Sequence, residues 1–427
     1  MNTISKTKNY LSRESLAQHY KTIRMFSEDF CKTLVTEDYV IQSIPDVSPT
    51  KWHLAHTSWF FEAFVLSEVD KNYKSLHPQY NFLFNSYYVK VGKRHARPQR
   101  GLLSRPTVKE VYEYRSYVDE KMNEFFKNAD DELFDSIAIV INIGLHHEQQ
   151  HQELMVTDIK HVFSCNPLHP KLIDAPEKVQ TNVPKINWIQ YEGGLKEIGF
   201  TGDGFFYDNE QPRHKAFLND FNLASRLITN GEYIEFINSG AYDKDELWLS
   251  DGIATVRQND WNAPLYWENK DGEWWHYTLQ GFRKVILDEP VVHVSFYEAE
   301  AFARWSGARL TTESEWEIAS QNLEVDGNFV ESGLYHPKSL TEKKEGLNQM
   351  YGDVWEWTRS DYSPYPGYKI PEGAIGEYNG KFMSGQLVLR GGSCATSITH
   401  IRNTYRNFFY PSSRWQFMGI RLAGDYD

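Results

Sequence analysis

The sequence predicts a protein of two domains, a helical domain followed by a mixed α+β domain. Helical periodicity of apolar residues runs through 10–165, whereas short strand-like runs and turn dipeptides fill the chain from Ile186 onward. Only three of the 27 glycines precede Lys185, and 11 of the 13 tryptophans follow it. A chain of 427 residues also exceeds what one hydrophobic core usually supports.

These observations set the predicted boundaries. We expect a helical bundle over 1–165, a linker over 166–185 and the mixed domain over 186–427. The linker is predicted from four prolines and the lack of a sustained apolar period. In the mixed domain, helices are predicted at 230–239 and 295–306, because each has aromatic residues on one face and a capping residue before it. The dipeptides Asp251-Gly252, Asp271-Gly272 and Asn379-Gly380 predict turns.

Composition excludes several classes of function. The chain has 58 acidic and 45 basic residues, and its net charge of -13 opposes binding to nucleic acid or to anionic membranes. The first 20 residues carry frequent charges, so they predict a capped amphipathic helix and not a signal peptide. No run approaches the roughly 20 apolar residues of a membrane span. The three widely spaced cysteines, Cys31, Cys165 and Cys394, do not form a disulfide framework. We therefore expect a cytoplasmic protein.

One predicted helix, over 136–163, carries several histidines. His147 and His151 are four residues apart on its apolar stripe, whereas His146 points away from that stripe. Imidazoles at this spacing can bind one metal ion, and nitrogen ligands suit zinc, iron, copper or nickel. The stretch therefore predicts two of the ligands of a metal site.

A second helix, predicted over 48–66, supplies a candidate third ligand. Ser48 is expected to cap this helix, and Pro49 lies in its first turn. His56 shares its apolar face and ranks first as the ligand, while His53, one turn earlier, is the alternative. For any one of these histidines taken alone, the simpler interpretation is a core side chain that only makes hydrogen bonds.

The stretch His147-Glu148-Gln149-Gln150-His151 also matches the H-E-x-x-H pattern of zinc metalloproteases, in which the glutamate is the general base. The third ligand that such enzymes carry downstream has no counterpart here. We keep this interpretation as a distant alternative.

Six short motifs occur in a fixed order along the chain. They are HLAH (53–56), HEQQH (147–151), ARLTTESEWE (308–317), GDVWEW (352–357), RGGS (390–393) and GIRLA (419–423). With them the chain resembles the nonheme iron sulfoxide synthases of ergothioneine biosynthesis, the hercynylcysteine S-oxide synthase family. The resemblance implies a DinB-like four-helix bundle followed by a formylglycine-generating-enzyme/C-type-lectin-like domain.

The resemblance also implies a reaction and a cofactor. His56, His147 and His151 would be the ligands of Fe(II), which would have open positions for substrates. Members of the family join hercynine, the trimethylated betaine of histidine, to a sulfur donor. They oxidise that sulfur to a sulfoxide, and dioxygen accepts all four electrons. Hercynine, cysteine and O2 are therefore the expected partners of this chain.

Residues that match the family's substrate positions lie in both parts of the chain. Gln150 would orient the substrate imidazole, and Asn407 and Phe408 would hold its trimethylammonium group, to which an aromatic face is suited. Members that use γ-glutamylcysteine have an aspartate where this chain has Phe409. Because phenylalanine cannot bind the ammonium group of that donor, free cysteine is the predicted donor.

The stretch over 84–107 supports the same donor. Arg97 and Arg100 match arginines that bind the donor carboxylate, and Arg94 is a weaker candidate; a solvated basic loop is the simpler interpretation. Tyr87 and Tyr88 resemble a tyrosine pair of the cysteine-using members, where a phenol delivers a proton or a hydrogen atom near the iron. Either tyrosine could act.

Several alternatives stay open. The same chemistry could use γ-glutamylcysteine, a selenium donor, or histidine itself in an ovothiol-type reaction. A binding protein with a vestigial iron site is the alternative from a different class. Oxidation of a peptidyl cysteine is disfavoured, because Cys394 stands alone where formylglycine-generating enzymes need a cysteine pair.

Overall fold

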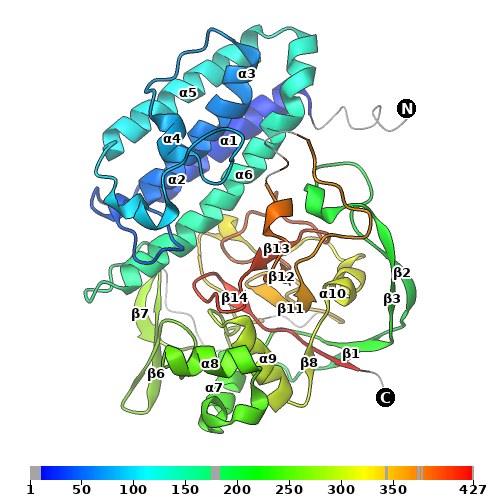
Figure 1. Ribbon diagram of the computed structural model, residues 1–427. Coiled ribbons are helices and arrows are strands. Elements are labelled where there is room, and N and C mark those ends of the chain that lie inside the picture. The colour runs from blue at the N-terminus through cyan, green and yellow to red at the C-terminus, as the bar shows by residue number, and fades with distance from the viewer. Residues whose placement is uncertain (1–10, 175–182, 342–344, 373–375, 377, 426–427) are drawn as a thin grey trace. The chain divides into compact units, whose positions relative to one another are not determined.

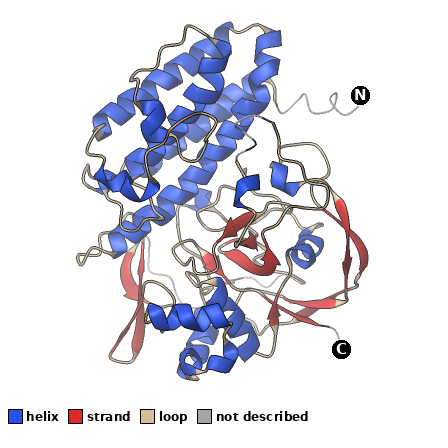
Figure 2. Ribbon diagram, in the orientation of Figure 1, coloured by secondary structure: helices blue, strands red, loops and turns tan. Residues whose placement is uncertain are grey.

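The computed structural model describes residues 11–174, 183–341, 345–372, 376 and 378–425, and these fall into two compact units. The helical unit consists of Met1–Asn166, Gly202–Phe205 and Pro371–Tyr378, and the mixed unit of Pro167–Thr201, Phe206–Ile370 and Asn379–Asp427. Figure 2 shows helices throughout the first unit and the strands in the second. The predicted linker contains residues outside the described ranges, and so does the start of the predicted N-terminal helix, so both boundaries stay predictions.

The helical unit is built on four long helices that lie side by side (Figure 1). Its helices are α1 (Arg13–Cys31), α2 (Thr50–Phe61), α3 (Ser67–Val69), α4 (Tyr80–Phe84), α5 (Val108–Asn128) and α6 (Asp131–Ser164). Side-chain caps define three of the starts: Ser12 before α1, the capping box of Thr107 and Glu110 at α5, and Asp130 before α6. The predicted histidine-bearing helix is thus confirmed, and it is longer than expected.

The start of α2 differs from its prediction. Pro49 occupies the N-cap position without a side-chain cap, so Ser48 does not cap the helix as expected. The Ser48 hydroxyl instead accepts a hydrogen bond from Arg100, and its backbone N–H donates to Asp158. After Phe61 the helix continues through a π-helical turn, Glu62–Leu66.

A buried carboxylate connects three of the long helices. Glu148 on α6 accepts from Arg24 on α1 at 3.1 Å and from Arg115 on α5 at 2.6 Å, and its other partner is the Ser27 hydroxyl at 2.7 Å. Burial alone would raise the pKa of Glu148, but the two guanidinium groups outweigh burial and lower the pKa to about 2. The bundle interior is therefore held together by a fully buried ion-pair cluster as well as by apolar packing.

Within its described residues, the mixed unit contains two four-stranded sheets and three smaller ribbons. The first four-stranded sheet has the spatial order β1 (Trp188–Tyr191), β4 (Phe221–Ala224), β15 (Leu422–Asp425) and β8 (Arg309–Leu310). The second has the order β13 (Asn407–Phe409), β12 (Leu387–Arg390), β11 (Trp355–Asp361) and β14 (Met418–Gly419). The ribbons are β2 (Gly194–Ile198) with β3 (His214–Leu218), β5 (Trp267–Lys270) with β6 (Glu273–Thr278) and β7 (Gly281–Lys284), and β9 (Gly327–Asn328) with β10 (Tyr351–Gly352).

The helices of this unit are α7 (Asn230–Asn238), α8 (Ser250–Gln258), α9 (Phe296–Trp305) and α10 (Glu313–Ser320). The two helices predicted here are confirmed as α7 and α9, each with a capping box. Asp271-Gly272 forms the predicted turn between β5 and β6 with positive φ at both residues, as a type I′ hairpin turn requires. The turn predicted at Asp251-Gly252 is wrong, because both residues lie in the first turn of α8.

The short motifs of the C-terminal half contact one another inside the mixed unit. Arg421 pairs with Glu356 at 2.9 Å, and the Trp316 indole donates to the same carboxylate at 2.8 Å. Arg390 donates to Glu313 at 3.1 Å and also pairs with Glu317. Because these side chains are buried, the motifs fix how α10, β11, β12 and the last strand pack together.

In the described ranges, no helix combines the length and the apolar character that crossing a bilayer requires. Among the described residues no disulfide forms: Cys31 and Cys394 are buried, and Cys165 is exposed.

Glu148→Gln should lower the free energy of unfolding of the helical unit by about 3 kcal/mol, because it removes the fully buried carboxylate that Arg24 and Arg115 share and leaves them only the more exposed Asp119 and Glu28. The pKa of Glu148 is depressed, so its contribution is present above the ordinary glutamate range and is lost as the pH falls toward about 2. Hydrogen exchange of the α6 amides measures the effect. Glu124→Gln, which breaks a surface pair with Lys121, is the control. Equal effects of the two variants would contradict the assignment.

Candidate metal centre

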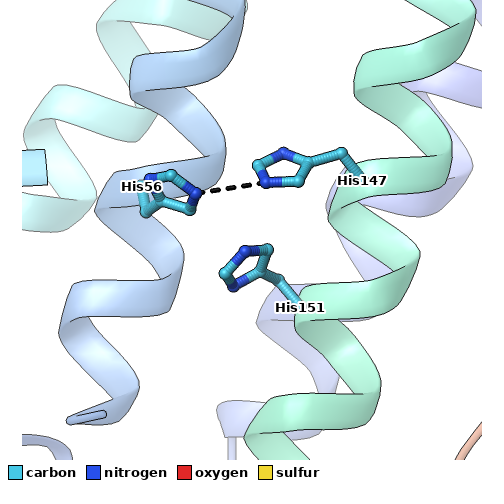
Figure 3. Close-up of side chains that lie close together, drawn as sticks. All are labelled: His56, His147 and His151. Carbon is cyan, nitrogen blue, oxygen red and sulfur yellow. Dashed lines mark hydrogen bonds between the residues drawn. The ribbon is translucent and has the colours of Figure 1, made fainter. Parts of the chain in front are cut away.

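Three buried imidazoles meet where α2 faces α6. His56 comes from α2, and His147 and His151 come from successive turns of α6 (Figure 3). Their candidate ligand atoms all lie within 4.8 Å of one another, and the Nε2 atoms of His56 and His147 are 3.1 Å apart. The structure therefore brings together the three histidines that the sequence singled out.

Close approach of the two helices is possible because α6 has a glycine one turn before the first of these histidines. A Cβ atom built on Gly144 would lie 2.7 Å from the Phe61 ring and 2.9 Å from the Phe60 ring, which is closer than real Cβ contacts. A larger residue would push α6 away from α2 and so separate His56 from His147.

The arrangement fits a transition-metal ion. For a metal–nitrogen bond of about 2.1 Å, two neighbouring ligand nitrogens are roughly 3–3.5 Å apart, which is the spacing of His56 and His147. His56 donates from Nδ1 to the Phe84 carbonyl at 2.6 Å, so its Nε2 lone pair faces the other imidazoles. His147 Nδ1 is buried and has no hydrogen-bond partner among the described residues. A cation bound by both Nε2 atoms would take the place of the hydrogen bond between them.

Burial also keeps these imidazoles neutral. It lowers the pKa of His56, His147 and His151, and the neighbouring histidines lower it further; for His147 the value is about 3. Because a metal binds the unprotonated nitrogen, all three side chains are ready to bind a metal ion near neutral pH.

His53, the alternative ligand, has other partners. Its Nδ1 lies 2.8 Å from His151 Nδ1, and its Nε2 lies 3.0 Å from Asp158 Oδ2. It thus contacts one of the three clustered histidines and does not complete the cluster. Periodicity could not separate it from His56, because every residue of α2 is buried.

The wall beside His56 is aromatic and cationic. Trp52 stacks on the His56 ring with centroids 4.6 Å apart, and the Arg100 guanidinium lies 3.3 Å above the Trp52 ring. Arg100 donates to the hydroxyls of Ser48 and Ser86 at 2.9 and 3.0 Å, while its Nε has no hydrogen-bond partner among the described residues. Burial lowers the pKa of Arg100 well below its usual range. No carboxylate in the described ranges forms a salt bridge with Arg100, so an anionic ligand would suit this position.

The two other arginines predicted near the site are placed differently. Arg97 is exposed and donates to the Asp46 carbonyl, and Arg94 is also exposed. The structure therefore does not place either beside Arg100 in the buried wall.

A tyrosine that sequence reasoning missed lies beside the cluster. The Tyr378 hydroxyl donates to Gln150 Oε1, and its ring lies edge-on to His147 and to Tyr87, at centroid distances of 5.7 and 6.2 Å. Tyr87 in turn stacks on Tyr88 at 4.6 Å, with their hydroxyls 3.5 Å apart. Tyr378 belongs to a segment far along the chain, and no motif marked it.

The remaining predicted residues lie on β13 in the mixed unit. Successive side chains of a strand point to opposite faces, so Asn407 and Phe409 share one face and Phe408 lies on the other. Phe408 stacks on Tyr362 at 4.0 Å, and Phe409 meets Trp415 edge-on at 5.7 Å. Asn407 and Phe408 therefore point to opposite faces of this short strand.

The metalloprotease interpretation is wrong. Both oxygens of Glu148 are occupied by Arg24, Arg115 and Ser27, and the side chain is buried. A general base must reach a substrate-bound water, and this carboxylate lies inside the bundle instead.

A second group of potential ligands, in the mixed unit, has a structural explanation. Glu289 lies near His276 and His336, and His336 Nε2 is 3.0 Å from its carboxylate. Arg283 donates to both Glu289 oxygens, at 3.0 and 2.8 Å. A divalent cation here would be buried beside a guanidinium group, so we interpret this group as an ion-pair network.

Comparisons with known proteins cover both units. Residues 19–155 match the DinB superfamily, and residues 174–426 match the sulfatase-modifying factor enzyme 1-like domain. The chain is 30% identical to the hercynine oxygenase of Mycolicibacterium smegmatis over 89% of this chain and 92% of that protein. It is 29% identical to that of Mycobacterium tuberculosis over 97% and 99%. Ergothioneine biosynthesis protein 1 of Schizosaccharomyces pombe is 28% identical over 51% of this chain and 27% of that protein.

We expect the purified chain to bind one equivalent of a divalent transition metal. Replacing His56, His147 or His151 with alanine should each weaken binding by at least about 100-fold, more than the loss of an outer hydrogen-bond partner does. Cobalt(II) titration followed by absorption measures the affinity. His146→Ala is the matched control, because His146 is on the same helix but stacks on Phe205. A second equivalent that survives these changes would show that the metal binds elsewhere.

Proposed function

The chain belongs to the hercynine oxygenase family, and we propose that it is an iron-dependent oxidoreductase of ergothioneine biosynthesis. It joins hercynine to L-cysteine and oxidises the sulfur to the sulfoxide. The observation that carries the proposal is the cluster of His56, His147 and His151 in a chain that matches hercynine oxygenases over most of its length. Membership of the family implies small-molecule substrates such as hercynine. That cysteine is the sulfur donor, dioxygen the oxidant and iron the metal is our proposal.

The overall reaction balances with dioxygen as the only oxidant. The C–H bond of the hercynine imidazole and the S–H bond of cysteine break, and a C–S bond and an S–O bond form. One oxygen atom enters the sulfoxide and the other leaves as water, so four electrons pass to dioxygen. Three neutral imidazoles leave open positions on Fe(II), and when bound the iron supplies this redox chemistry.

Arg100 is the residue proposed to hold the donor carboxylate. Its guanidinium is buried on Trp52, which stacks on His56, so an anion on Arg100 would lie near the metal cluster. A planar guanidinium can bind a carboxylate through two parallel hydrogen bonds. The nearby Arg97 remains a proposed contributor on the resemblance alone. The donor's carboxylate would thus fix where its thiol lies.

Three phenols are proposed to hold or move protons. Tyr87 and Tyr88 match the tyrosine pair of the cysteine-using members, and Tyr378 joins them through its contacts with Tyr87 and His147. Tyr378 also donates to Gln150, the residue proposed to orient the substrate imidazole. A phenol placed here can deliver a proton as sulfur is oxidised, and it links that step to substrate orientation.

Residues of β13 are proposed to select the substrates. Asn407 and Phe408 would contact the trimethylammonium group of hercynine, and Phe409 would exclude the ammonium group of γ-glutamylcysteine. Phe409 packs against Trp415 and offers no polar atom. Cysteine is therefore the proposed donor, and γ-glutamylcysteine, a selenium donor and histidine as the acceptor are outcomes of the test below.

The iron-loaded enzyme, given hercynine, cysteine and air, should form hercynylcysteine sulfoxide. Mass spectrometry of the products measures this, and each donor is offered alone and in competition. Cysteine should be preferred, and Phe409→Asp should shift the preference toward γ-glutamylcysteine by supplying a carboxylate for its ammonium group. The His56→Ala enzyme should form no sulfoxide, because it lacks a metal ligand.

The controls distinguish the alternatives. If the unaltered enzyme already prefers γ-glutamylcysteine, the role given to Phe409 is wrong. If it couples cysteine to histidine in place of hercynine, the ovothiol-type reaction replaces the proposed one. If it binds iron but forms product only with a selenium donor, the selenium alternative is correct.

Arg100→Lys should raise the KM for cysteine by about tenfold or more, because an ammonium group cannot reproduce the two-bonded contact with a carboxylate. The KM for hercynine should change little. Steady-state kinetics with each substrate varied in turn measures this. Arg105→Lys is the control, since Arg105 is exposed and donates to its neighbour's carbonyl. A larger effect for Arg97→Lys would move the assignment to Arg97.

A further inference from the structure

We infer that Asp158 and His53 are positioning residues that set the tautomer of His151 and so aim its Nε2 lone pair at the metal. The inference rests on the three-histidine metal centre of the proposed function, but it does not depend on which substrates are used. It assigns a role to two buried residues that the proposed reaction leaves unexplained.

The three side chains form a continuous chain of hydrogen bonds. Asp158 Oδ2 lies 3.0 Å from His53 Nε2, and His53 Nδ1 lies 2.8 Å from His151 Nδ1. All three side chains are buried, so water does not compete for these contacts. We call this chain the Asp158–His53–His151 relay.

Proton accounting gives the relay one direction. Asp158 Oδ2 also accepts a hydrogen bond of 2.8 Å from the backbone N–H of Ser48, which can only donate. An ionised carboxylate can only accept hydrogen bonds, so His53 Nε2 carries the proton between them. A neutral His53 then has its lone pair on Nδ1, so it accepts from His151 Nδ1–H. The remaining lone pair of His151 is on Nε2.

The opposite arrangement would disable His151. If His53 Nδ1 carried the proton, His151 Nδ1 would be the acceptor and Nε2 would be protonated and unable to bind a metal. His53 Nε2 would then face the buried carboxylate without a proton, leaving two acceptors in contact. The carboxylate of Asp158 therefore selects the tautomer of His151 through the intervening His53.

The relay is built from the helices that carry the metal ligands. His53 is one turn before His56 on α2, and Asp158 is seven residues after His151 on α6, so both lie on the facing sides of these helices. His56 has the same tautomer as His151, but a different partner fixes it, because His56 Nδ1 donates to the Phe84 carbonyl. Two of the three candidate ligands thus have Nδ1 as the donor and the lone pair on Nε2. Such outer partners usually contribute about 10–100-fold to metal affinity.

Cobalt(II) affinity of the full-length chain tests the relay by titration against a competing chelator. His53→Phe should weaken binding by about 10–100-fold, because it removes the acceptor for His151 Nδ1–H. His53→Asn should weaken it less, since the asparagine oxygen can stand where Nδ1 stood and still accept. His336→Phe is the matched control: it also removes a buried histidine paired with a carboxylate, at 3.0 Å, but in the mixed unit, and should leave affinity unchanged.

Histidine-labelled nitrogen NMR of the metal-free protein gives a readout that a merely structural role would not move. His151 should be protonated at Nδ1 in the unaltered chain and in His53→Asn, and should lose this preference in His53→Phe. Nε2 protonation of His151 in the unaltered chain would overturn the inference. So would a His53→Phe affinity within about twofold of the unaltered chain, or an equal loss in His336→Phe. If the expected order holds but no sulfoxide forms, the relay stands and the proposed reaction falls.

Discussion

The buried carboxylate of Glu148 fixes how α6 is rotated within its bundle, and the metal centre depends on that rotation. Its two guanidinium partners come from α1 and α5, so three helices must present the right residue at one level. Adjacent residues of a helix point about 100° apart, so His147 faces α2 only while Glu148 faces the arginines. A rotation by one residue would bury an unpaired charge, which is strongly unfavourable, and would also carry the imidazoles away from His56.

In the mixed unit, buried ion pairs likewise fix the position of β13, the strand that carries proposed substrate-binding residues. Arg406 pairs with Glu313 at 2.9 Å, and Glu313 also binds Arg390, so the start of β13 is held to α10 and β12 by buried charges. Asn407 follows Arg406 directly, as His147 directly precedes Glu148. In both units a residue with a proposed chemical role is adjacent in sequence to a buried ion-pair residue. The buried ion pair fixes the backbone at that point, and so it also fixes where the adjacent residue lies.

The sequence predicted what depends on local periodicity. The stripe of α6, with His147 and His151, and the helices α7 and α9 are all amphipathic or capped in ways that short windows reveal. It could not predict what depends on distant segments. Every residue of α2 is buried, so no polar face distinguished His56 from His53. Tyr378 reaches Gln150 across 228 positions of sequence. Ser48 does not cap α2, because the helix begins one residue later with Pro49 at the N-cap, and the polar groups of Ser48 bind Arg100 and Asp158.

The positive charges of the buried site explain why it would bind an anionic sulfur donor. Burial keeps the three imidazoles neutral, so a divalent iron would bring positive charge that the histidines do not offset. Arg100 adds a further positive charge, and no described carboxylate forms a salt bridge with it. The one carboxylate of the relay, Asp158, contacts Ser48 and His53 instead. Removing charge from water is costly unless it is paired, so the site favours a ligand that brings anions of its own. Cysteine offers two, a thiolate for the metal and a carboxylate for Arg100.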